Sequence, residues 1–530
     1  MSVDDLRQQL RQRGYLTHGI ERWFALDPWS SRAFWLELVL VALKAATLIG
    51  VFAALPRTAV MLFRNYPLTA FETLALFLTY AAAWLVAAFV VVILIALILK
   101  VRPALPIDTP RALLAISLAA SALLVAPVAV WWYRFDTPPT TAELIAGAAL
   151  TAIFFVVAAI VVSAALLSFS IYELQRVPAI HQKPRGVPMA VAAAALIALL
   201  FVPAYADRER TTIEPMVVTR PTNQRVALIA VDGLTREILE PRLDLVVLAV
   251  APLPADSTTE RWASLGTGVR TEAHGVRAIE GVRFRGSRHI LQRISRIDGV
   301  LMNAAPLLGI ARREPLPPTV RRREYVWEIA ARRGVPSVAV NWWTTGDERA
   351  GGLVSVGQES IFNAARGDAL RVDALASARF LQEVDRAKPR FATVYLPALD
   401  VILNRAGYDQ TTRLAQSLRA LDGVSALIRA LRARGYDVIL AGLPGDHQFG
   451  RGVVASNVHL TSPGSAWHVA PTILDLLGFP LSAEMPGQSM AATPSTEPRI
   501  PSYGRRNAAQ PAQGVNEEYY ENLKSLGYIR

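Results

Sequence analysis

Cysteine is absent from all 530 residues of this sequence. Disulfide bridges, thiol nucleophiles and cysteine-ligated metal sites are therefore excluded, and a domain outside the cytoplasm would have to rely on its core alone. Charged residues are also scarce, at 18% of the chain, whereas 52% of the residues are hydrophobic. The mean hydropathy of +0.31 is too high for an ordinary soluble protein, so part of the chain is expected to lie in lipid.

The sequence also lacks any basic stretch with interleaved aromatic residues, which argues against nucleic acid as a partner. Basic residues nevertheless outnumber acidic ones, 55 against 43, and give a net charge of +12. Such a surplus would suit the anionic headgroups of a membrane surface. A genome rich in arginine codons would produce the same surplus without any function, so the charge alone identifies no partner. Nothing in the sequence indicates an oligomeric state.

Five apolar runs account for the high hydropathy, and each is long enough to cross a bilayer as a helix of about 20 residues. They are Ala33–Leu55, Leu74–Leu99, Ala112–Trp132, Leu144–Phe169 and Val187–Ala206. Lysine and arginine gather before the first run and in the second and fourth loops. By the positive-inside rule the N-terminus is cytoplasmic, and an odd number of spans places everything after Ala206 outside. In a bacterium this is the periplasmic face of the inner membrane.

Downstream of the last run the pattern changes to short β-branched segments alternating with helical periodicity. Strands are predicted at Val226–Val231, Leu245–Val250, Val338–Val340, Phe391–Leu396 and Val438–Ala441, and helices at Tyr325–Arg333, Asp373–Ala387 and Thr411–Arg434. This alternation predicts an α/β domain with a mostly parallel central sheet and helices on both faces. The expected organisation is a cytoplasmic amphipathic leader (1–32), a five-span bundle (33–206), a linker (207–224), the α/β domain (225–490), and a linker with a C-terminal docking segment (491–530).

Polar residues follow several of the predicted strands, at the edge where parallel sheets bind ligands. They are Asp232, Thr258, Asp400, Asp446 and His447. Carboxylates, a hydroxyl and an imidazole converging on one edge suit a divalent cation. Each of them also has a plainer interpretation, because a lone aspartate often stabilises a turn and the Ser257-Thr-Thr cluster is typical of a helix cap.

The order of these motifs resembles the alkaline phosphatase superfamily and, within it, the type I phosphodiesterase/nucleotide pyrophosphatase branch. The segments concerned are Val231-Asp-Gly, Ser257-Thr-Thr with Thr267-Gly and His274-Gly-Val, Tyr395-Leu-Pro-Ala-Leu-Asp400, Gly445-Asp-His447 and Val469-Ala-Pro-Thr-Ile-Leu-Asp-Leu-Leu-Gly478. Val326-Trp-Glu-Ile, Val340-Asn-Trp-Trp-Thr and Leu523-Lys-Ser-Leu-Gly-Tyr528 are similar to bacterial members. The resemblance covers about residues 225 to 530, and the ordered set is far more specific than any one motif.

The resemblance implies roles for individual residues. It makes Thr258 the nucleophile, with Thr259 as the fallback, and it places Asp232, Thr258, Asp446 and His447 around one metal ion, zinc in most of the family and Mn²⁺ as the alternative. His274 matches a histidine that we interpret as structural. Asp400 and Asn404 are a remnant of the family's second metal site, because position 404 is asparagine where the family has histidine. No histidine follows His447 closely, and His459 or His468 would substitute only if the chain were rerouted.

The expected activity is therefore phosphoryl transfer with one metal ion. The layout of five spans and an outer domain is similar to that of phosphoethanolamine transferases and lipoteichoic acid synthases, which implies a phosphate ester on a lipid or lipid-linked glycan as substrate. Phosphodiester hydrolysis and transfer of a lipid headgroup both remain open. The alternative is a degenerate pseudoenzyme that binds a phosphate-containing or lipid ligand without turnover. A sulfatase is disfavoured, because those enzymes need a cysteine- or serine-derived formylglycine within a surrounding motif that this chain lacks.

Overall fold

A computed structural model of the chain describes a helical N-terminal region and an α/β region. The described residues are 34–64, 70–101, 110–133, 141–174, 220–239, 245–253, 257–287, 289–292, 303–404, 408–445, 450–461, 464–506 and 517–529, with 5, 8, 9, 12 and 255 singly. The chain divides into two compact units. The first comprises Met1–Arg210 with the short segments Phe284–Ser287 and Ile294–Ala311, and the second comprises the rest.

Among the described residues, the first unit contains four long helices: α3 (Phe34–Arg64), α4 (Ala70–Val101), α5 (Pro110–Tyr133) and α6 (Thr141–Leu174). Three of them contain stretches long and apolar enough to cross a membrane: Leu38–Ala59, Ala70–Ile95 and Leu144–Leu166. Because lipid offers no hydrogen bonds, hydroxyl groups in such helices must bond internally. Those of Thr47, Thr58 and Thr79 do so by donating to the carbonyl four residues earlier.

Only part of the expected five-span bundle is therefore confirmed. The first, second and fourth predicted runs fall in α3, α4 and α6, and each of these helices holds a candidate span. The third run forms α5, whose apolar stretch, Leu114–Ala129, is shorter. The fifth run, Val187–Ala206, lies outside the described residues, as does most of the predicted amphipathic leader.

The second unit is organised around an eight-stranded sheet with the order β2-β10-β9-β1-β8-β5-β7-β6. Its strands are β1 (Val226–Asp232), β2 (Val246–Val250), β5 (Ser337–Val340), β6 (Glu348–Ala350), β7 (Leu353–Val356), β8 (Phe391–Leu396), β9 (Asp437–Leu443) and β10 (Gly452–Ser456). The five central strands, from β9 to β7, are mutually parallel. β10 runs antiparallel to both β9 and β2, and β6 runs antiparallel to β7. The predicted, mostly parallel sheet is confirmed.

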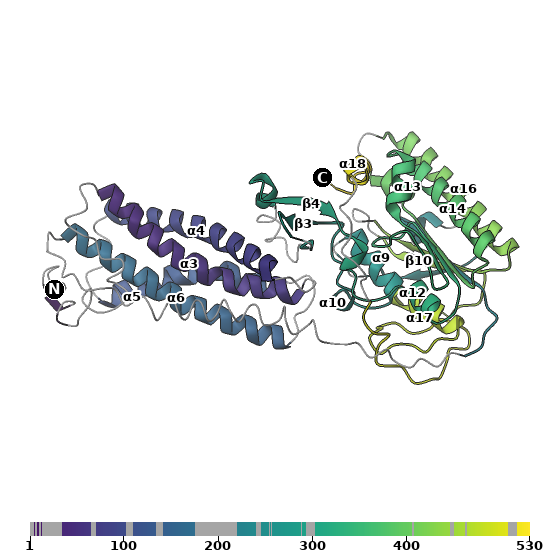
Figure 1. Ribbon diagram of the computed structural model, residues 1–530, viewed down its shortest axis with the longest axis horizontal. Helices are drawn as coiled ribbons and strands as arrows, with labels where there is room; N and C mark the ends of the chain where they lie inside the picture. The colour runs from purple at the N-terminus through teal and green to yellow at the C-terminus, as the bar shows by residue number, and fades with distance from the viewer. Residues whose placement is uncertain are drawn as a thin grey trace. The chain divides into compact units, whose positions relative to one another are not determined.

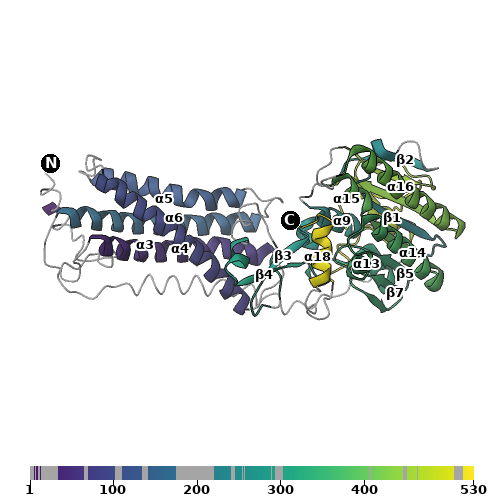
Figure 2. The same ribbon diagram turned by 90° about the horizontal axis from the view of Figure 1, so that it is seen from above.

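Helices cover both faces of this sheet (Figures 1 and 2). One face carries α13 (Gln358–Ala365), α14 (Ala369–Ala387) and α16 (Gln410–Ala433), and the other carries α9 (Thr258–Thr267), α12 (Val326–Arg332) and α17 (Val469–Leu476). The shorter helices are α8 (Arg236–Leu239), α10 (Thr271–His274) and α15 (Ala398–Asn404). Every residue of β1, β5 and β8 is buried, as expected for parallel strands covered on both sides.

Two further elements complete the described chain. β3 (Glu280–Phe284) and β4 (Ala311–Pro315) form a separate two-stranded sheet. The C-terminal segment begins with α18 (Glu517–Ser525), and Leu523, Leu526 and Ile529 are buried in the core of the α/β unit. The first part of the expected linker, 491–506, also packs on this unit: the hydroxyl of Tyr503 donates to the carbonyl of Pro480.

Candidate functional site

Asp232 closes β1 at the edge of the sheet where the parallel strands end. Its side chain is fully buried, and Oδ1 accepts a hydrogen bond from the backbone N–H of Gly233 at 3.2 Å. Oδ2 accepts a second one from the hydroxyl of Tyr395, in β8, at 2.7 Å. Burial raises the pKa of Tyr395 well above its ordinary value, and the charge of Asp232 raises it further. The tyrosine therefore remains a proton donor that fixes the orientation of the carboxylate.

The Ser257-Thr-Thr cluster lies at the same edge, at the start of α9. β2 pairs antiparallel with β10, which pairs antiparallel with β9, so β2 runs parallel to the central strands and ends with them. Ser257 is the helix cap: its Oγ accepts from the backbone N–H of Glu260 at 3.1 Å and donates to the carbonyl of Arg277 at 2.8 Å. Because Ser257 takes the capping role, the hydroxyls of Thr258 and Thr259 do not serve it.

Thr258 and Thr259 are the first two residues of α9, and each is about 1% exposed. The Oγ1 atom of Thr259 is buried and has no hydrogen-bond partner among the residues that the structure describes. The first turn of a helix presents backbone N–H groups that have no partner within the helix. The start of α9 therefore combines two threonine side chains with donors suited to an anion.

Two contacts of α9 place its start beside the ends of β8 and β9. Trp262 is one turn after Thr258 on the same helix face, and its ring centroid lies 5.4 Å from that of Tyr395. Arg261 Nη1 donates to the carbonyl of Pro444, directly after β9, at 2.6 Å. The tyrosine that orients Asp232 thus also packs against the helix that begins with Thr258.

Asp400 approaches the same edge from α15. Gly233 has a φ of +76°, and a Cβ there would lie 2.7 Å from the Cα of Asp400, so the end of β1 fits against α15 only because position 233 is glycine. A Cβ on Gly445 would overlap Oδ1 of Asp400. The backbones after β1 and after β9 are therefore both within contact distance of Asp400.

Asn404 lies one turn after Asp400, at the position where the resemblance leads one to expect a histidine. Its Nδ2 donates to Asp400 Oδ1 at 2.6 Å, so a neutral amide contacts the carboxylate. His459 does not replace the missing histidine, because it follows β10, whose last residues pair with the beginning of β9 at the opposite edge. His468 Nδ1 accepts from the backbone N–H of Gln488, at the start of α17.

The remaining two predicted ligands, Asp446 and His447, lie outside the described residues. Within the described part of the chain no three histidine, aspartate or glutamate side chains form a group able to hold a metal ion. Asp232, Thr258 and Asp400 converge on one edge, and their carboxylate and hydroxyl oxygens are donors that divalent cations accept. In donor type these residues fit the metal ion that the resemblance implies.

His274 is held inside the protein on both sides of its ring. Nε2 lies 2.9 Å from Ser264 Oγ, and Nδ1 accepts from the backbone N–H of Val276 at 3.1 Å. Burial lowers the pKa of His274 well below its ordinary value, and the charge of Arg277 lowers it further. A neutral histidine with both nitrogens engaged agrees with the structural role expected for it.

Tyr528 is a site residue to which the sequence pattern assigned no role. Its hydroxyl oxygen is buried and has no hydrogen-bond partner among the described residues, and its ring packs edge-on against Trp343 with centroids 5.4 Å apart. Burial raises the pKa of Tyr528 well above its ordinary value, and the charges of Asp232 and Asp400 add to the effect. The chain end therefore brings a permanently protonated hydroxyl close to the two carboxylates.

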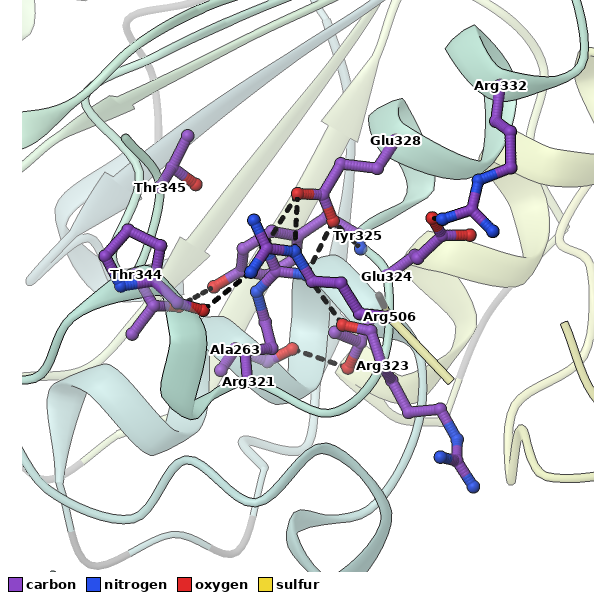
Figure 3. A network of polar contacts seen from close by, with 12 residues as sticks. Ala263, Arg321, Arg323, Glu324, Tyr325, Glu328, Arg332, Thr344, Thr345 and Arg506 are labelled. Carbon is purple, nitrogen blue, oxygen red and sulfur yellow. Dashed lines mark hydrogen bonds and ion pairs between the residues drawn. The ribbon is translucent and has the colours of Figure 1, made fainter. Parts of the chain in front are cut away.

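A buried polar network supports α9 from behind (Figure 3). Arg321 is fully buried and forms two hydrogen bonds to the carboxylate of Glu328, at 2.6 and 2.7 Å. Its guanidinium carbon lies 3.7 Å from the ring centroid of Tyr325, which in turn packs on Gly266 of α9. Burial alone would raise the pKa of Glu328, but the charge of Arg321 outweighs it and lowers that pKa to about 2. For Glu324 burial prevails and raises the pKa to about 7.

Comparison with known proteins gives one match in sequence. Residues 226–452, from the start of β1 to the start of β10, match the family model described as type I phosphodiesterase / nucleotide pyrophosphatase. No curated relative matches the chain. The matched region contains Asp232, Thr258 and Asp400, and it also contains the predicted ligands Asp446 and His447.

Three solved structures to which the chain is similar are distant from it in sequence. Phosphonoacetate hydrolase from Sinorhizobium meliloti 1021 is 11% identical, with a TM-score of 0.29 over 43% of this chain and 60% of that chain. Murine ectonucleotide pyrophosphatase / phosphodiesterase 5 is 15% identical, with a TM-score of 0.27 over 41% and 56%. This chain thus covers less than two thirds of either protein. Lipooligosaccharide phosphoethanolamine transferase A from Neisseria meningitidis, an integral membrane protein, is 12% identical, with a TM-score of 0.32 over 82% and 96%.

Proposed function

We propose that this chain is a membrane-anchored, metal-dependent phosphoryl-transfer enzyme, acting as a phosphodiesterase or as a lipid-headgroup phosphotransferase, with Thr258 as its nucleophile. The observation that carries the proposal is the convergence of Asp232, the Thr258 end of α9 and Asp400 on one edge of the sheet, within the segment that matches the phosphodiesterase family model. Asp232, Thr258, Asp446 and His447 are the proposed metal ligands.

Each residue then has a defined task. Thr258 Oγ1 attacks phosphorus in line with the departing alcohol, and the resulting phosphothreonine passes its group to water or to an acceptor alcohol. The backbone N–H groups in the first turn of α9 hold equatorial phosphoryl oxygens. Tyr395 keeps the Asp232 carboxylate oriented, as outer hydrogen bonds commonly do for metal ligands. A divalent ion, Zn²⁺ or alternatively Mn²⁺, would lower the pKa of the threonine hydroxyl and offset phosphoryl charge.

One ion is proposed rather than two. Asn404 already donates to Asp400 at 2.6 Å, His459 follows the end of β10 at the opposite edge of the sheet, and Nδ1 of His468 already accepts from the backbone N–H of Gln488. The amide of Asn404 and the hydroxyl of Tyr528 supply neutral donors near Asp400, where a second cation would otherwise offset its charge. This arrangement supports a single-metal site.

We also propose that five spans anchor the chain in a bacterial inner membrane, with the N-terminus in the cytoplasm and the α/β domain in the periplasm. Three candidate spans and the distribution of basic residues support this topology. Within the first unit, Ser287 Oγ donates to Glu72 Oε1 at 2.7 Å, and Glu72 lies in the first turn of α4. The segment that contains Ser287 therefore lies on the same side of the membrane as the loop between α3 and α4, which the topology places outside. A phosphate ester on a lipid or lipid-linked glycan is the substrate class that such an anchor favours.

Replacing Tyr528 with phenylalanine is expected to lower kcat/KM for a phosphodiester by roughly 10-fold or more. The Tyr528 hydroxyl has no partner among the described residues and is proposed to donate to the charged phosphoryl group of the substrate; a hydrogen bond to a charged group contributes about 1.5–3 kcal/mol. The ring contacts with Trp343 and Phe362 are retained, so the thermal midpoint of unfolding should change little. Tyr519→Phe is the matched control, since it removes a hydroxyl on the same segment that donates to Gln358 instead. Equal rates for the two variants would contradict the assignment of Tyr528.

Metal content is the direct test of the proposed site. The full-length chain in detergent is expected to hold about one zinc or manganese ion per molecule by elemental analysis, and to hydrolyse a generic phosphodiester. Asp232→Asn should lose the ion and the activity together, because the amide has nearly the same shape as the carboxylate but lacks the negative charge that binds the cation. An ion bound without any turnover would instead support the pseudoenzyme, for which Asn404 at a ligand position is the favouring observation. No bound ion and no turnover would refute the mechanism.

A further inference from the structure

Three large aliphatic side chains that are close in sequence are exposed at the end of the β3–β4 hairpin. Leu307 is 88% exposed and Leu308 74% exposed, and Ile310 is exposed beside them. Outside the four long helices, the other exposed large hydrophobic residues among those described are Val246 and Leu414, each from a separate element. Single exposed leucines are ordinary, but a contiguous group of this kind is typical of an interaction surface.

The backbone holds this group in a fixed turn. Residues 303–307 are helical, Gly309 has a φ of +68°, and the N–H of Arg285 donates to the carbonyl of Ile310 at 3.1 Å. Residues 284–287 and 303–312 are called the hairpin end below. Because the turn is hydrogen-bonded, the exposure of its leucines is a property of the fold.

Apart from Arg312, the residues of the hairpin end belong to the same compact unit as the candidate membrane spans. Ser287 bonds to Glu72 in the first turn of α4, and a Cβ on Gly286 would lie 3.3 Å from the ring of Phe71. The candidate span in α4 begins at Ala70. The hairpin end therefore contacts the very end of a span, which is the depth of the membrane–water interface.

Charge on the hairpin end is of one sign. Glu280 and Glu314 are engaged by Arg313 and Arg283, at 3.4 and 2.7 Å. Arg285 and Arg312 are exposed and form no ion pair with the described residues, and Arg285 reaches over Gly309 next to the leucines. An apolar tip flanked by these arginines is the pattern of an interfacial membrane anchor, because the arginines are attracted to anionic lipid phosphates while the apolar side chains enter the acyl region.

We propose that the hairpin end inserts Leu307, Leu308 and Ile310 into the bilayer leaflet on its side of the membrane, with Arg285 and Arg312 at anionic lipid phosphates. This lipid-binding surface shares no residue with the catalytic edge. It rests on the membrane location of the chain and does not depend on the proposed phosphoryl transfer. Its consequence is a second attachment of the α/β domain to lipid, in addition to the chain that follows the spans.

The absence of cysteine allows a clean test in the full-length chain. Leu308→Cys, labelled with an environment-sensitive fluorophore, is reconstituted in nanodiscs of phosphatidylethanolamine and phosphatidylglycerol. The matched control is Leu414→Cys on α16, which replaces a leucine that is 61% exposed. The probe at 308 is expected to emit at shorter wavelength and to be quenched by lipids that carry a nitroxide on the acyl chain, whereas the probe at 414 is not.

Changing the lipid composition separates the contribution of the arginines from that of the aliphatic side chains. Replacing phosphatidylglycerol with phosphatidylcholine, or combining the label with Arg285→Ala and Arg312→Ala, is expected to reduce the quenching at 308. Equal, weak quenching at 308 and 414 would overturn the proposal. A shorter emission wavelength at 308 without acyl-chain quenching would also overturn it, because the tip would then be covered by protein, for example by a second copy of the chain.

Discussion

Thr258→Ala is expected to reduce kcat/KM for a phosphodiester by at least about 1000-fold, because the variant has no hydroxyl to form the phosphothreonine. The alanine keeps the helix start intact, since the cap is Ser257 and not Thr258. Substrate binding should weaken much less than turnover does, as the N–H groups of the first turn remain. Steady-state kinetics of the purified full-length chain would measure both effects.

Thr259→Ala is the matched control for this variant. It removes the neighbouring hydroxyl from the same helical turn, at the same burial, and is expected to retain most of the activity. Thr258→Ser keeps a nucleophilic hydroxyl and should retain part of the activity. If Thr259→Ala were the inactive variant, the fallback nucleophile would be the correct one. Full activity in both alanine variants would exclude a threonine nucleophile at this edge.

Arg321→Met should destabilise the α/β domain by about 3–5 kcal/mol at neutral pH, the cost of leaving a buried charge without its partner. Glu328 would lose both hydrogen bonds from Arg321 and would keep those from the backbone N–H of Tyr325, at 2.8 Å, and from Arg506, at 3.3 Å. Denaturant unfolding followed by near-UV circular dichroism would measure the difference, since several buried tryptophans lie near the network.

The effect of Arg321→Met should also depend on pH. The folded-state pKa of Glu328 is about 2, below the ordinary value of 4.5, so the folded protein binds this proton less readily than the unfolded chain does. The stability from the charged pair is therefore complete above about pH 4.5 and is lost as the pH falls towards 2. The difference in the free energy of unfolding between the wild type and Arg321→Met should therefore become smaller as the pH falls from about 4.5 towards 2.

Arg434→Met provides the control for this prediction. Arg434 also forms two hydrogen bonds to one carboxylate, that of Asp385, but here the arginine side chain is 32% exposed and the aspartate 56%. Exposed pairs contribute about 0–1 kcal/mol, so this variant should unfold almost like the wild type. If both variants lost a comparable amount of unfolding free energy, burial would not explain the contribution of the Arg321–Glu328 pair to stability.

Much of the sheet was predictable because β-branched runs bounded by polar residues are a direct signature of buried parallel strands. Once β1, β8 and β9 were recognised, placing Asp232 and Asp400 at one edge followed from the geometry of parallel sheets. The direction of a strand, in contrast, leaves no trace in a five-residue run such as Gly452–Ser456, and β6 is a three-residue exposed strand without any pattern. β10 and β6 therefore required the structure.

The supporting residues of the site were hidden for a different reason. Tyr395 sits inside an apolar run and looks like any buried strand residue, yet its hydroxyl reaches Asp232. Tyr528 comes near the same carboxylates only because the C-terminal segment docks on the domain. Such a tertiary contact cannot be predicted from a local hydrophobic pattern. The interpretation of Ser257-Thr-Thr was open between cap and nucleophile, and the hydrogen bond from Glu260 to Ser257 assigns the cap. The roles of Asp446 and His447 stay predictions.

The antiparallel return of β10 restricts how a second metal site can be gained or lost during evolution. Residues 444–451 form the whole connection between β9 and β10, and the chain then leaves the catalytic edge. By the proposed assignment, Asn404→His would supply one ligand of a second metal site, but the histidine that the family carries after its Asp-His pair would still be absent from the sequence. A longer connection without that second histidine would not complete the site either. Both changes are needed together, so single substitutions are not expected to give this chain a second ion.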